Sequence, residues 1–368
     1  MYRTVRYLTK LDKVSGLSDE EREKLKQVEE KFPFRANEYY LDLIDWSDPD
    51  DPIRKIIIPQ TEELDEWGSL DPSNESRYTV VHGLEHKYRD TAVILTTEFC
   101  GSYCRFCFRK RLFMHLKHDE IARDITPDLD YIEEHKEITN VLLTGGDPLA
   151  LSTRNLETLI GNLRAMDHIR IIRIGTKIPA FNPYRILSDP HLLEVISKFS
   201  RPRRRIYIVT QFNHPREITE VAIEAVNLLI KAGAILVNQT PILRGINDNP
   251  DTLRELFKKL SFIGISPYYA FQCRPTVGNK PFRVPIVESY WLFERAKQGI
   301  SGLAKRARLA MSHATGKVEI LAVTEDNIIL RYHRSPEPED RGRVVVFKKN
   351  PDAYWLDQLG EPLEVVTP

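Results

Sequence analysis

Three of the four cysteines in this chain lie within eight residues of one another, at Cys100, Cys104 and Cys107. Their spacing is C-x3-C-x2-C, and the aromatic residue Phe106 directly precedes the third cysteine. Three thiolates on one short loop can bind three irons of a 4Fe-4S cluster and leave the fourth iron open. The alternatives are a structural zinc site completed by Cys273 or a histidine, and thiols that are simply buried. Four cysteines in 368 residues are too few for a disulfide framework, so metal binding in a reducing compartment explains them better.

The position of these cysteines depends on the elements around them. From residue 91 onward, short apolar runs alternate with amphipathic stretches of helical length. We expect six strands, at residues 92–97, 141–144, 169–174, 206–210, 234–237 and 265–271. We expect helices near residues 118–136, 153–166, 188–198, 216–232, 250–262 and 286–300. This alternation predicts an α/β fold with a parallel sheet and right-handed crossovers, and six such units suggest an open, partial (βα)6 barrel.

Residues suited to ligand binding follow the expected strands at the points where those strands end. The cysteines follow the first strand, and the other candidates are Gly145, Gly146 and Asp147 after the second, Gln211 after the fourth, Gln239 after the fifth and Arg274 after the sixth. In sheets of this kind ligands bind beyond the carboxyl ends of the strands. We therefore expect these residues to converge on one mouth.

Segments of different character flank the barrel, which we assign to residues 89–300. Residues 1–88 are polar and broken by turn signals, with a helix expected at 19–31, and so we expect an N-terminal helical region. Residues 301–368 begin with a Lys/Arg-rich segment and continue with three expected strands, at 318–323, 328–332 and 344–347. We assign them to a small C-terminal module that contains β-strands.

The charge composition limits the class of partner. Lys and Arg number 53, as do Asp and Glu, so no overall field would draw the chain to nucleic acid or to an anionic membrane surface. The basic run at residues 201–205 is typical of a solvated loop. The first residues contain no apolar core of a signal peptide, and nowhere do 18 apolar residues follow one another. We therefore expect a soluble, cytoplasmic protein.

The cysteine loop in this context resembles the signature of the radical S-adenosylmethionine (SAM) superfamily. Its spacing, its aromatic residue and the Gly-Gly-Asp-Pro sequence after the second strand all match that superfamily. From about residue 37 to about residue 333, the chain also resembles the lysine 2,3-aminomutase family. The matching stretches outside the cysteine loop are residues 39–45, 51–55, 83–90, 173–176, 212–215, 238–240, 243–248, 267–269 and 272–273.

This resemblance implies a reaction and its cofactors. A reduced 4Fe-4S cluster would cleave SAM, the 5′-deoxyadenosyl radical would take a β-hydrogen from an amino acid, and the amino group would migrate to the β-carbon while attached to pyridoxal phosphate (PLP). The resemblance also implies a small-molecule amino-acid substrate, an electron donor such as flavodoxin or ferredoxin, and a homodimer. The alternative on the same scaffold is a radical SAM enzyme that does not use PLP and acts on another small molecule or on a protein side chain.

The resemblance also assigns residues to the two organic cofactors. For SAM, it implies Phe106 against the adenine, the backbone of residues 145–147 around the methionyl group, and Gln211 and Gln239 near the ribose. For PLP, it implies that Lys317 carries the cofactor, although the family's glycine run before this lysine is reduced to one glycine here. Lys87 and Tyr88 are implied to lie near PLP.

Two differences from the family concern charged groups. Lys87 replaces an arginine near PLP, and Thr91 replaces a second basic residue close by. Arg109 matches an arginine that binds the substrate α-carboxylate, for which a guanidinium is suited because it can bind bidentately.

The substrate side chain is expected to differ from that of lysine. The family's two aspartates that bind the lysine ammonium group are replaced by Arg274 and, approximately, by Ala310. A cationic side chain would meet an arginine there, whereas a carboxylate would suit it. Glutamate 2,3-aminomutase, which resembles this family, has a lysine at the position of Arg274. The alternative is that Arg274 pairs with an acidic neighbour and has no bearing on the substrate.

Overall fold

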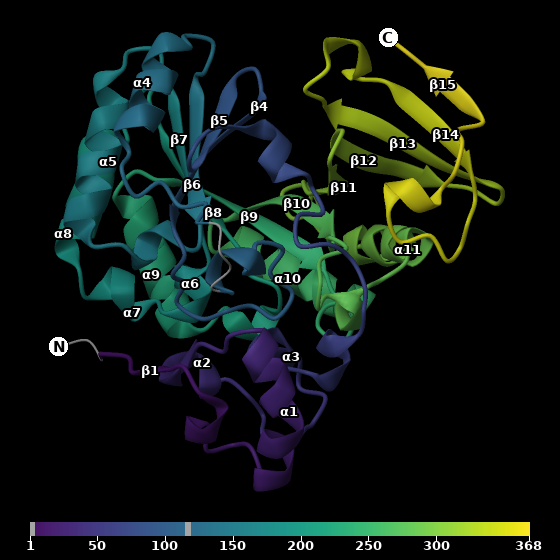
Figure 1. The fold of residues 1–368 in the computed structure, drawn as a ribbon, viewed down its shortest axis with the longest axis horizontal. Coiled ribbons are helices and arrows are strands. Elements are labelled where there is room, and N and C mark those ends of the chain that lie inside the picture. Colours follow the sequence, from purple (N-terminus) through teal and green to yellow (C-terminus); the bar gives the residue numbers. More distant parts are fainter. Residues whose placement is uncertain (1–3, 115–118) are drawn as a thin grey trace.

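The computed structural model describes residues 4–114 and 119–368 of the chain. Within these residues, one mixed sheet of 13 strands runs through the molecule in the order β15-β14-β13-β12-β11-β10-β9-β8-β7-β6-β5-β4-β3. Six parallel strands form its centre: β5 (Thr91–Thr97), β6 (Asn140–Gly145), β7 (Ile171–Thr176), β8 (Ile206–Thr210), β9 (Ile235–Ile242) and β10 (Ser266–Gln272). The six predicted strands are confirmed, and the structure is of the predicted α/β class (Figure 1).

The side chains of the parallel strands alternate between a buried face and a cavity. In β6 and β7, Val141, Leu143, Ile172 and Ile174 are fully buried in the core. The residues between them line the cavity, as Arg173 does in β7. This period-2 alternation is what a strand imposes on its side chains. It gives the sheet one face for packing against helices and another for chemistry.

Helices follow the parallel strands, and several of them cover the outer side of the sheet (Figure 1). The long helices are α4 (Thr126–Glu134), α5 (Thr153–Ala165), α8 (Pro190–Phe199), α9 (Glu220–Lys231), α10 (Pro250–Phe262) and α11 (Ile286–Lys297). The first was predicted to begin at residue 118, which lies outside the described residues. The helix begins only at Thr126, because the Asp124 side chain accepts the backbone N–H of Thr126 and forms a turn before it. Two short helices, α6 (Ile178–Phe181) and α7 (Tyr184–Leu187), were not predicted.

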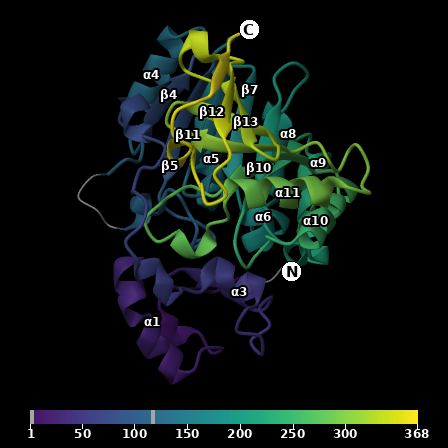
Figure 2. The same cartoon turned by 90° about the vertical axis from the view of Figure 1, so that its right-hand side faces the viewer.

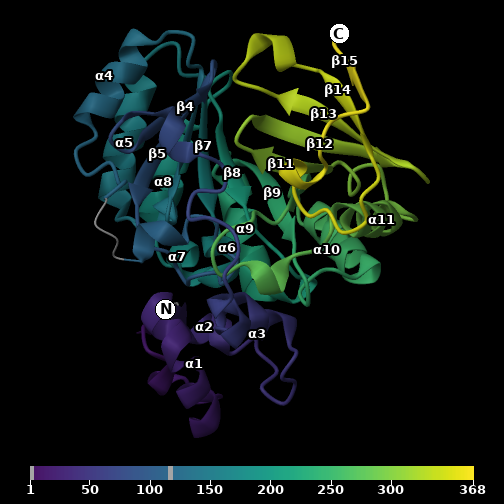
Figure 3. The same cartoon turned by 45° about the vertical axis from the view of Figure 1, so that its right-hand side comes forward.

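The N-terminal segment packs beneath the sheet (Figures 2 and 3). Its elements are β1 (Tyr7–Leu8), α1 (Asp19–Lys31), β2 (Ala36–Asn37), α2 (Glu38–Leu41) and α3 (Pro52–Ile57). The predicted helix at 19–31 is confirmed, and a reciprocal capping box between Ser18 and Glu21 fixes its start.

The sheet begins earlier in the chain than the sequence suggested. Strands β3 (Thr79–Val81) and β4 (Leu84–Tyr88) lie in the region predicted to be helical, and β4 pairs antiparallel with β5. They form a hairpin at Gly83, where φ is +87° and a Cβ would collide with Ala122. In the sequence, the β-branched residues at 79–81 form too short a run before Gly83 to predict a strand.

The C-terminal segment continues the same sheet. Its strands are β11 (Arg308–His313), β12 (Gly316–Val323), β13 (Asn327–Arg334), β14 (Val344–Lys348) and β15 (Glu364–Val366). The three predicted strands are confirmed, whereas β11 and β15 were missed. The missed strand β11 pairs parallel with β10 and antiparallel with β12, and so it joins the parallel and antiparallel parts of the sheet.

None of the helices in the two described ranges has both the length and the apolar character needed to cross a membrane.

A buried ion pair connects the N-terminal segment to the cysteine loop. The Nη2 atom of Arg105 lies 2.8 Å from Oε2 of Glu63, and the side chains are 3% and 0% exposed. Arg105 Nε also donates to Glu63 Oε1 over 3.0 Å. Breaking such a pair on one side leaves an uncompensated buried charge.

We therefore predict that Glu63→Gln lowers the free energy of unfolding by about 3–5 kcal/mol. Replacing both residues, as Glu63→Leu with Arg105→Met, should cost less because neither charge remains. Urea denaturation of the anaerobic protein, followed by circular dichroism, measures this free energy. The exposed pair Glu20–Lys24 provides the control, since Glu20→Gln should leave the midpoint nearly unchanged. A Glu63→Gln midpoint equal to that of the control would contradict the prediction.

Candidate active site

One cavity of about 330 Å³ brings the predicted site residues together. Its wall includes all three loop cysteines and every residue assigned above to SAM, PLP or substrate: Lys87, Tyr88, Cys100, Cys104, Phe106, Cys107, Arg109, Gly145, Gly146, Asp147, Gln211, Gln239, Arg274 and Lys317. They come from the carboxyl ends of the parallel strands and from the antiparallel strands β4 and β12 on either side. The expectation of one common mouth is confirmed.

The N-terminal segment fixes the backbone of the cysteine loop. Arg35 Nε donates to the carbonyl of Cys100 over 2.9 Å. The buried amide of Asn37 donates to the carbonyls of Gly101 and Phe181, over 2.8 and 2.9 Å. Because each buried polar group finds a partner, the loop is held in one conformation.

Burial opposes the loss of protons from the three thiols of this loop. Burial raises the pKa of Cys100, Cys104 and Cys107, and the charges of Asp147 and of the other two cysteines raise that of Cys100 further. A thiolate that binds metal is deprotonated in the process.

The donor set has the chemistry of an iron–sulfur site, because all three loop cysteines line the same cavity. A cubane takes one thiolate on each of three irons. Three cysteines on one cavity wall fit a 4Fe-4S cluster.

The glycines at the end of β6 allow a close approach to the chain that leads into the cysteines. Gly145 has a φ of +106°, and a Cβ there would lie 2.8 Å from the carbonyl oxygen of Thr97. A Cβ on Gly146 would collide with the carbonyl of Phe99, one residue before Cys100. The turn and the cysteine loop therefore pack backbone against backbone.

The carboxylate of Asp147 is occupied by the protein itself. It accepts hydrogen bonds from the backbone N–H groups of Leu149, Lys177 and Ile178, over 3.0, 2.7 and 3.1 Å. It also accepts one from the hydroxyl of Thr176 over 2.9 Å. Burial raises the pKa of Asp147 to about 6. Its side chain thus joins the ends of β6 and β7, and only its backbone is left to face a ligand.

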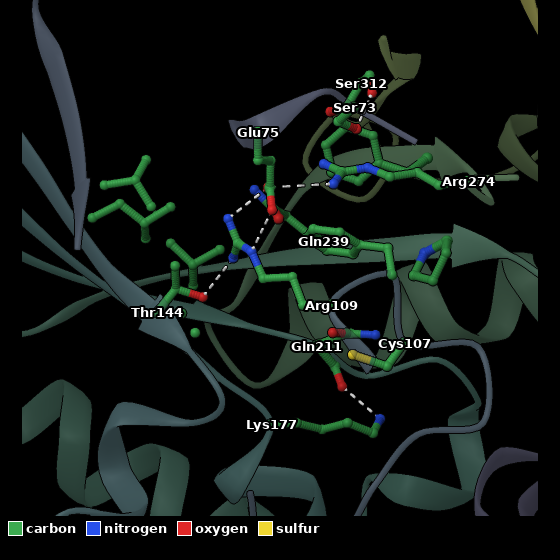
Figure 4. A pocket seen from close by; sticks show the side chains of 18 of the residues that line it. Ser73, Glu75, Cys107, Arg109, Thr144, Lys177, Gln211, Gln239, Arg274 and Ser312 are labelled. Carbon is green, nitrogen blue, oxygen red and sulfur yellow. Dashed lines mark hydrogen bonds and ion pairs between the residues drawn. The ribbon is translucent and has the colours of Figure 1, made fainter. Parts of the chain in front are cut away.

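Lys177 supports the loop after β8 in a similar way, and the sequence did not single it out. Its ammonium group donates to the carbonyl of Gln211, the side chain of Asn213 and the carboxylate of Glu217, over 2.7, 2.7 and 2.6 Å. Figure 4 shows Lys177 reaching Gln211 beside Cys107. The backbone of Gln211 is therefore fixed, and its side chain remains available.

Glu75 lies at the centre of the upper part of the cavity and was also missed by the sequence. One oxygen lies 2.8 Å from Arg109 Nη2 and the other lies 2.8 Å from Arg111 Nη2. Arg274 Nη1 lies 3.7 Å from the first oxygen (Figure 4). Burial alone would raise the pKa of Glu75, but Arg109 and Arg111 hold it well below its usual range. The residue is therefore ionised.

A second carboxyl group, Glu85 on β4, behaves in the opposite way. Its side chain is 8% exposed, and its Oε1 atom lies 3.7 Å from Arg109 Nη2. Burial and the negative charge of Glu75 raise the pKa of Glu85 to about 8, against the attraction of Arg109. Glu85 therefore carries a proton at neutral pH.

Arg274 has an acidic neighbour, as the alternative reading required, but shares it. Its guanidinium stacks on the ring of Phe108 at 3.5 Å from the centroid, and its contact with Glu75 is long. Burial lowers the pKa of Arg274 to about 10, so the group stays charged. One ionised Glu75 and a more exposed Glu120 partner three arginines, and the cluster keeps a net positive charge.

Lys317 lies near the start of β12, with its amine against aromatic rings. The Nζ atom is 4.2 Å from the ring centroid of Tyr269 and 5.2 Å from that of Phe271. Burial, followed by the charges of Arg173, Arg334, Arg274 and Lys87, lowers the pKa of Lys317 well below its usual range. The surroundings therefore favour the neutral amine.

Lys87 and Tyr88 lie beside the turn that precedes Lys317. Lys87 Nζ donates to the carbonyls of His313 and Ala314, over 2.8 and 2.7 Å. Tyr88 lies under the guanidinium of Arg334, whose carbon is 4.2 Å from the ring centroid. Of the cations near Lys317, the sequence had not singled out Arg173 or Arg334 as site residues.

Comparison with known proteins agrees with this geometry. A family model described as the Radical SAM superfamily matches residues 94–257. A protein of Aquifex aeolicus (strain VF5), provisionally named L-lysine 2,3-aminomutase, is 54% identical over 362 residues, which cover 98% of this chain and 96% of its own. L-lysine 2,3-aminomutase of Clostridium subterminale is 38% identical over 295 residues, 79% of this chain and 69% of its own. Glutamate 2,3-aminomutase of Clostridioides difficile (strain 630) is 35% identical over 295 residues, 80% and 68% of the two chains.

The superfamily match runs through the cysteine loop and strands that form the cavity wall, and the match to named aminomutases extends over most of the chain. A 4Fe-4S cluster and SAM follow from membership of that superfamily. This chain is therefore a radical SAM enzyme of the lysine 2,3-aminomutase family.

Proposed function

We propose that this enzyme is a PLP-dependent amino-acid 2,3-aminomutase whose substrate has an anionic rather than a cationic side chain. The observation that carries the proposal is the place of Lys317. Its amine, held neutral by burial and by nearby cations, lines the same cavity as the three cysteines. An amine must be neutral to bond to an aldehyde such as that of PLP. One cavity thus offers a site for radical formation and a site for an amino-group carrier.

The residues at the cysteine end would hold SAM, and Lys317 would hold PLP at the other end. When bound, the cluster and SAM supply a carbon radical, and PLP supplies a conjugated carrier for the amino group. For SAM we propose Phe106, the backbone of residues 145–147, and the side chains of Gln211 and Gln239, all of which line the cavity. We further propose that the six parallel strands form an open, partial barrel, and that flavodoxin or ferredoxin reduces the cluster.

Arg109 retains the donors that a substrate carboxylate requires. A guanidinium has five N–H donors. Glu75 accepts from Nε and Nη2 of Arg109, and Thr144 accepts from Nη1 over 3.1 Å. One N–H on each Nη atom remains for another acceptor, such as a carboxylate. Glu75 and Thr144 would therefore orient Arg109 for the α-carboxylate.

The charges in the cavity favour an anionic side chain. The carboxyl groups among its wall residues are Glu75, Glu85 and Asp147. Glu75 is paired with arginines, Glu85 carries a proton at neutral pH, and Asp147 accepts four hydrogen bonds from the protein. A cationic side chain would find no unpaired anion among them, whereas Arg274 offers a positive charge.

A PLP-independent radical SAM enzyme on the same scaffold is the second candidate. Two observations favour it. Lys87, at the position of the family's arginine, donates to backbone carbonyls instead of facing a ligand, and only Gly316 remains of the glycine run. This candidate requires a full cluster and cleavage of SAM without PLP on Lys317.

Covalent labelling with PLP separates these two candidates. Reduction with borohydride after incubation with PLP should fix one PLP covalently to Lys317, as detected by peptide mass spectrometry. Lys317→Ala should abolish this labelling, and Lys348→Ala, a change at an exposed lysine on β14, should not alter it. Cluster absorbance without labelled Lys317 would overturn the aminomutase proposal in favour of the PLP-free enzyme.

The charge of Arg274 should determine which substrate side chain the enzyme prefers. Removing the charge in Arg274→Met should lower kcat/KM for acidic amino acids about 10- to 100-fold, because a charge-assisted hydrogen bond contributes about 1.5–3 kcal/mol. Conversion to the β-amino acid is followed by NMR in anaerobic, SAM-supplied enzyme. Lys297→Met removes a cation from α11 and should leave kcat/KM unchanged. Faster turnover of lysine than of acidic amino acids by the unaltered enzyme would contradict the assignment.

The ionisation of Glu85 should make KM depend on pH. As the pH rises through about 8, Glu85 ionises beside Arg109 and adds negative charge to the substrate site. KM for an anionic substrate should therefore increase above this pH. In Glu85→Gln no charge can form, and KM should stay lower than in the unaltered enzyme at pH 9. Parallel pH profiles for the two proteins would show that Glu85 does not titrate near the substrate.

A further inference from the structure

A group of cations surrounds Lys317 on the cavity wall. Beside the lysine itself, the charges that lower its pKa belong to Arg173, Arg334, Arg274 and Lys87, and all four residues line the cavity. Burying several like charges together is unfavourable unless an anion is bound among them. Glu75 is the nearby anion for Arg274, and it lies on that residue's side of the cavity. The question is which anion the other cations bind.

Arg334 lies beside Thr91, the position at which this chain has no basic residue. Its Nη2 atom lies 3.2 Å from the hydroxyl of Thr91, and its guanidinium stacks on Tyr88. Arg334 pairs with Lys317 in the antiparallel register of β12 and β13, so both side chains start from neighbouring positions. Arg334 lies on β13 and Thr91 lies on β5, toward the other end of the sheet. The Arg334 side chain therefore places a positive charge next to Thr91.

Asp90 is the only carboxylate among the described residues that forms an ion pair with Arg334. The Asp90 side chain is 60% exposed and is not part of the cavity wall. An exposed pair of this kind contributes little. It uses Nη2, and no hydrogen bond joins Nε or Nη1 of Arg334 to another of the described residues. Arg334 itself is 31% exposed.

Arg173, on β7, contributes a second guanidinium to the cavity wall. Its Nε atom donates to the side chain of Asn140 over 2.9 Å. The described residues offer no hydrogen bond to its two Nη atoms. Burial, and among nearby charges that of Arg334, lower the pKa of Arg173. A guanidinium on a cavity wall, with no partner for either Nη atom among the described residues, is a binding group for an oxyanion.

We propose that Arg334 and Arg173 bind the phosphate group of PLP when Lys317 carries the cofactor. This inference rests on the proposed function and specifies one of its sites. Arg334 supplies a positive charge next to Thr91, and Arg173 would supply a second guanidinium from β7 on the cavity wall. Lys87 fixes the turn before Lys317 through two carbonyls and contributes its charge without being a main ligand. Two arginines suit a phosphate monoester, whose oxygens accept bidentate hydrogen bonds.

The test compares a ligand that has the phosphate group with one that lacks it. Anaerobic protein containing its cluster is titrated with PLP or with pyridoxal, and the fraction bound to Lys317 is measured by absorbance and by borohydride fixation. In Arg334→Gln and Arg173→Gln, the Kd for PLP should rise about 10- to 100-fold, because each loses a charge-assisted hydrogen bond. The Kd for pyridoxal should change less than threefold in either variant, since pyridoxal lacks the phosphate group to which these hydrogen bonds would be made.

Two further variants test whether a change in Kd comes from the lost charge or from misfolding. Arg331→Gln, on the same strand, removes a cation that pairs with Glu319 outside the cavity and should leave both Kd values unchanged. Arg334→Lys keeps the charge and should bind PLP more tightly than Arg334→Gln. Equal PLP affinity in Arg334→Gln, Arg173→Gln and the unaltered protein would overturn this inference and leave the proposed function standing. Failure of the unaltered protein to fix PLP on Lys317 would overturn both.

Discussion

The buried carboxylate of Glu75 is the interaction on which the active-site region depends. It joins three parts of the chain: the segment before β3, the cysteine loop through Arg109 and Arg111, and the end of β10 through Arg274. Three arginines placed together without it would repel one another in a medium of low polarity. Burial, together with the negative charge of the ionised Glu75, raises the pKa of the neighbouring Glu85 to about 8.

This arrangement divides the cavity into regions with different electrostatic character. At the cysteine end, the charged side chains of Asp147 and Lys177 are used to hold backbone and neighbouring loops. At the other end, Arg173 and Arg334 keep donors that the protein does not use, around an amine held neutral. The first region is suited to a cluster whose ligands must not move. The second is suited to an anionic cofactor and substrate.

The parallel part of the fold and the cysteine loop could be predicted because their signals are local. Runs such as 206–210 are apolar enough to identify a buried strand, and the cysteine spacing lies within eight residues. Strand β11 was missed because Arg308 begins it within a Lys/Arg-rich stretch, although Leu309 and Met311 are buried in its interior. Glu75 and Arg334 could not be found from spacing. Their partners lie 34 and 243 residues away in sequence, at Arg109 and Thr91.

The continuous sheet explains how Lys317 and the cysteine loop, which are distant in sequence, can line one cavity. Strand β11 pairs parallel with β10 and antiparallel with β12, so a ladder of backbone hydrogen bonds runs from Arg274, just after β10, to Lys317 in β12. A register shift of one residue in β12 would turn Lys317 to the other face of the sheet. Gly316 secures this register, because a Cβ there would collide with the carbonyl of Arg334 on β13. The single glycine that remains of the family's run is thus the one that the pairing of β12 with β13 requires, and the position of Lys317 relative to the cysteines follows from that pairing.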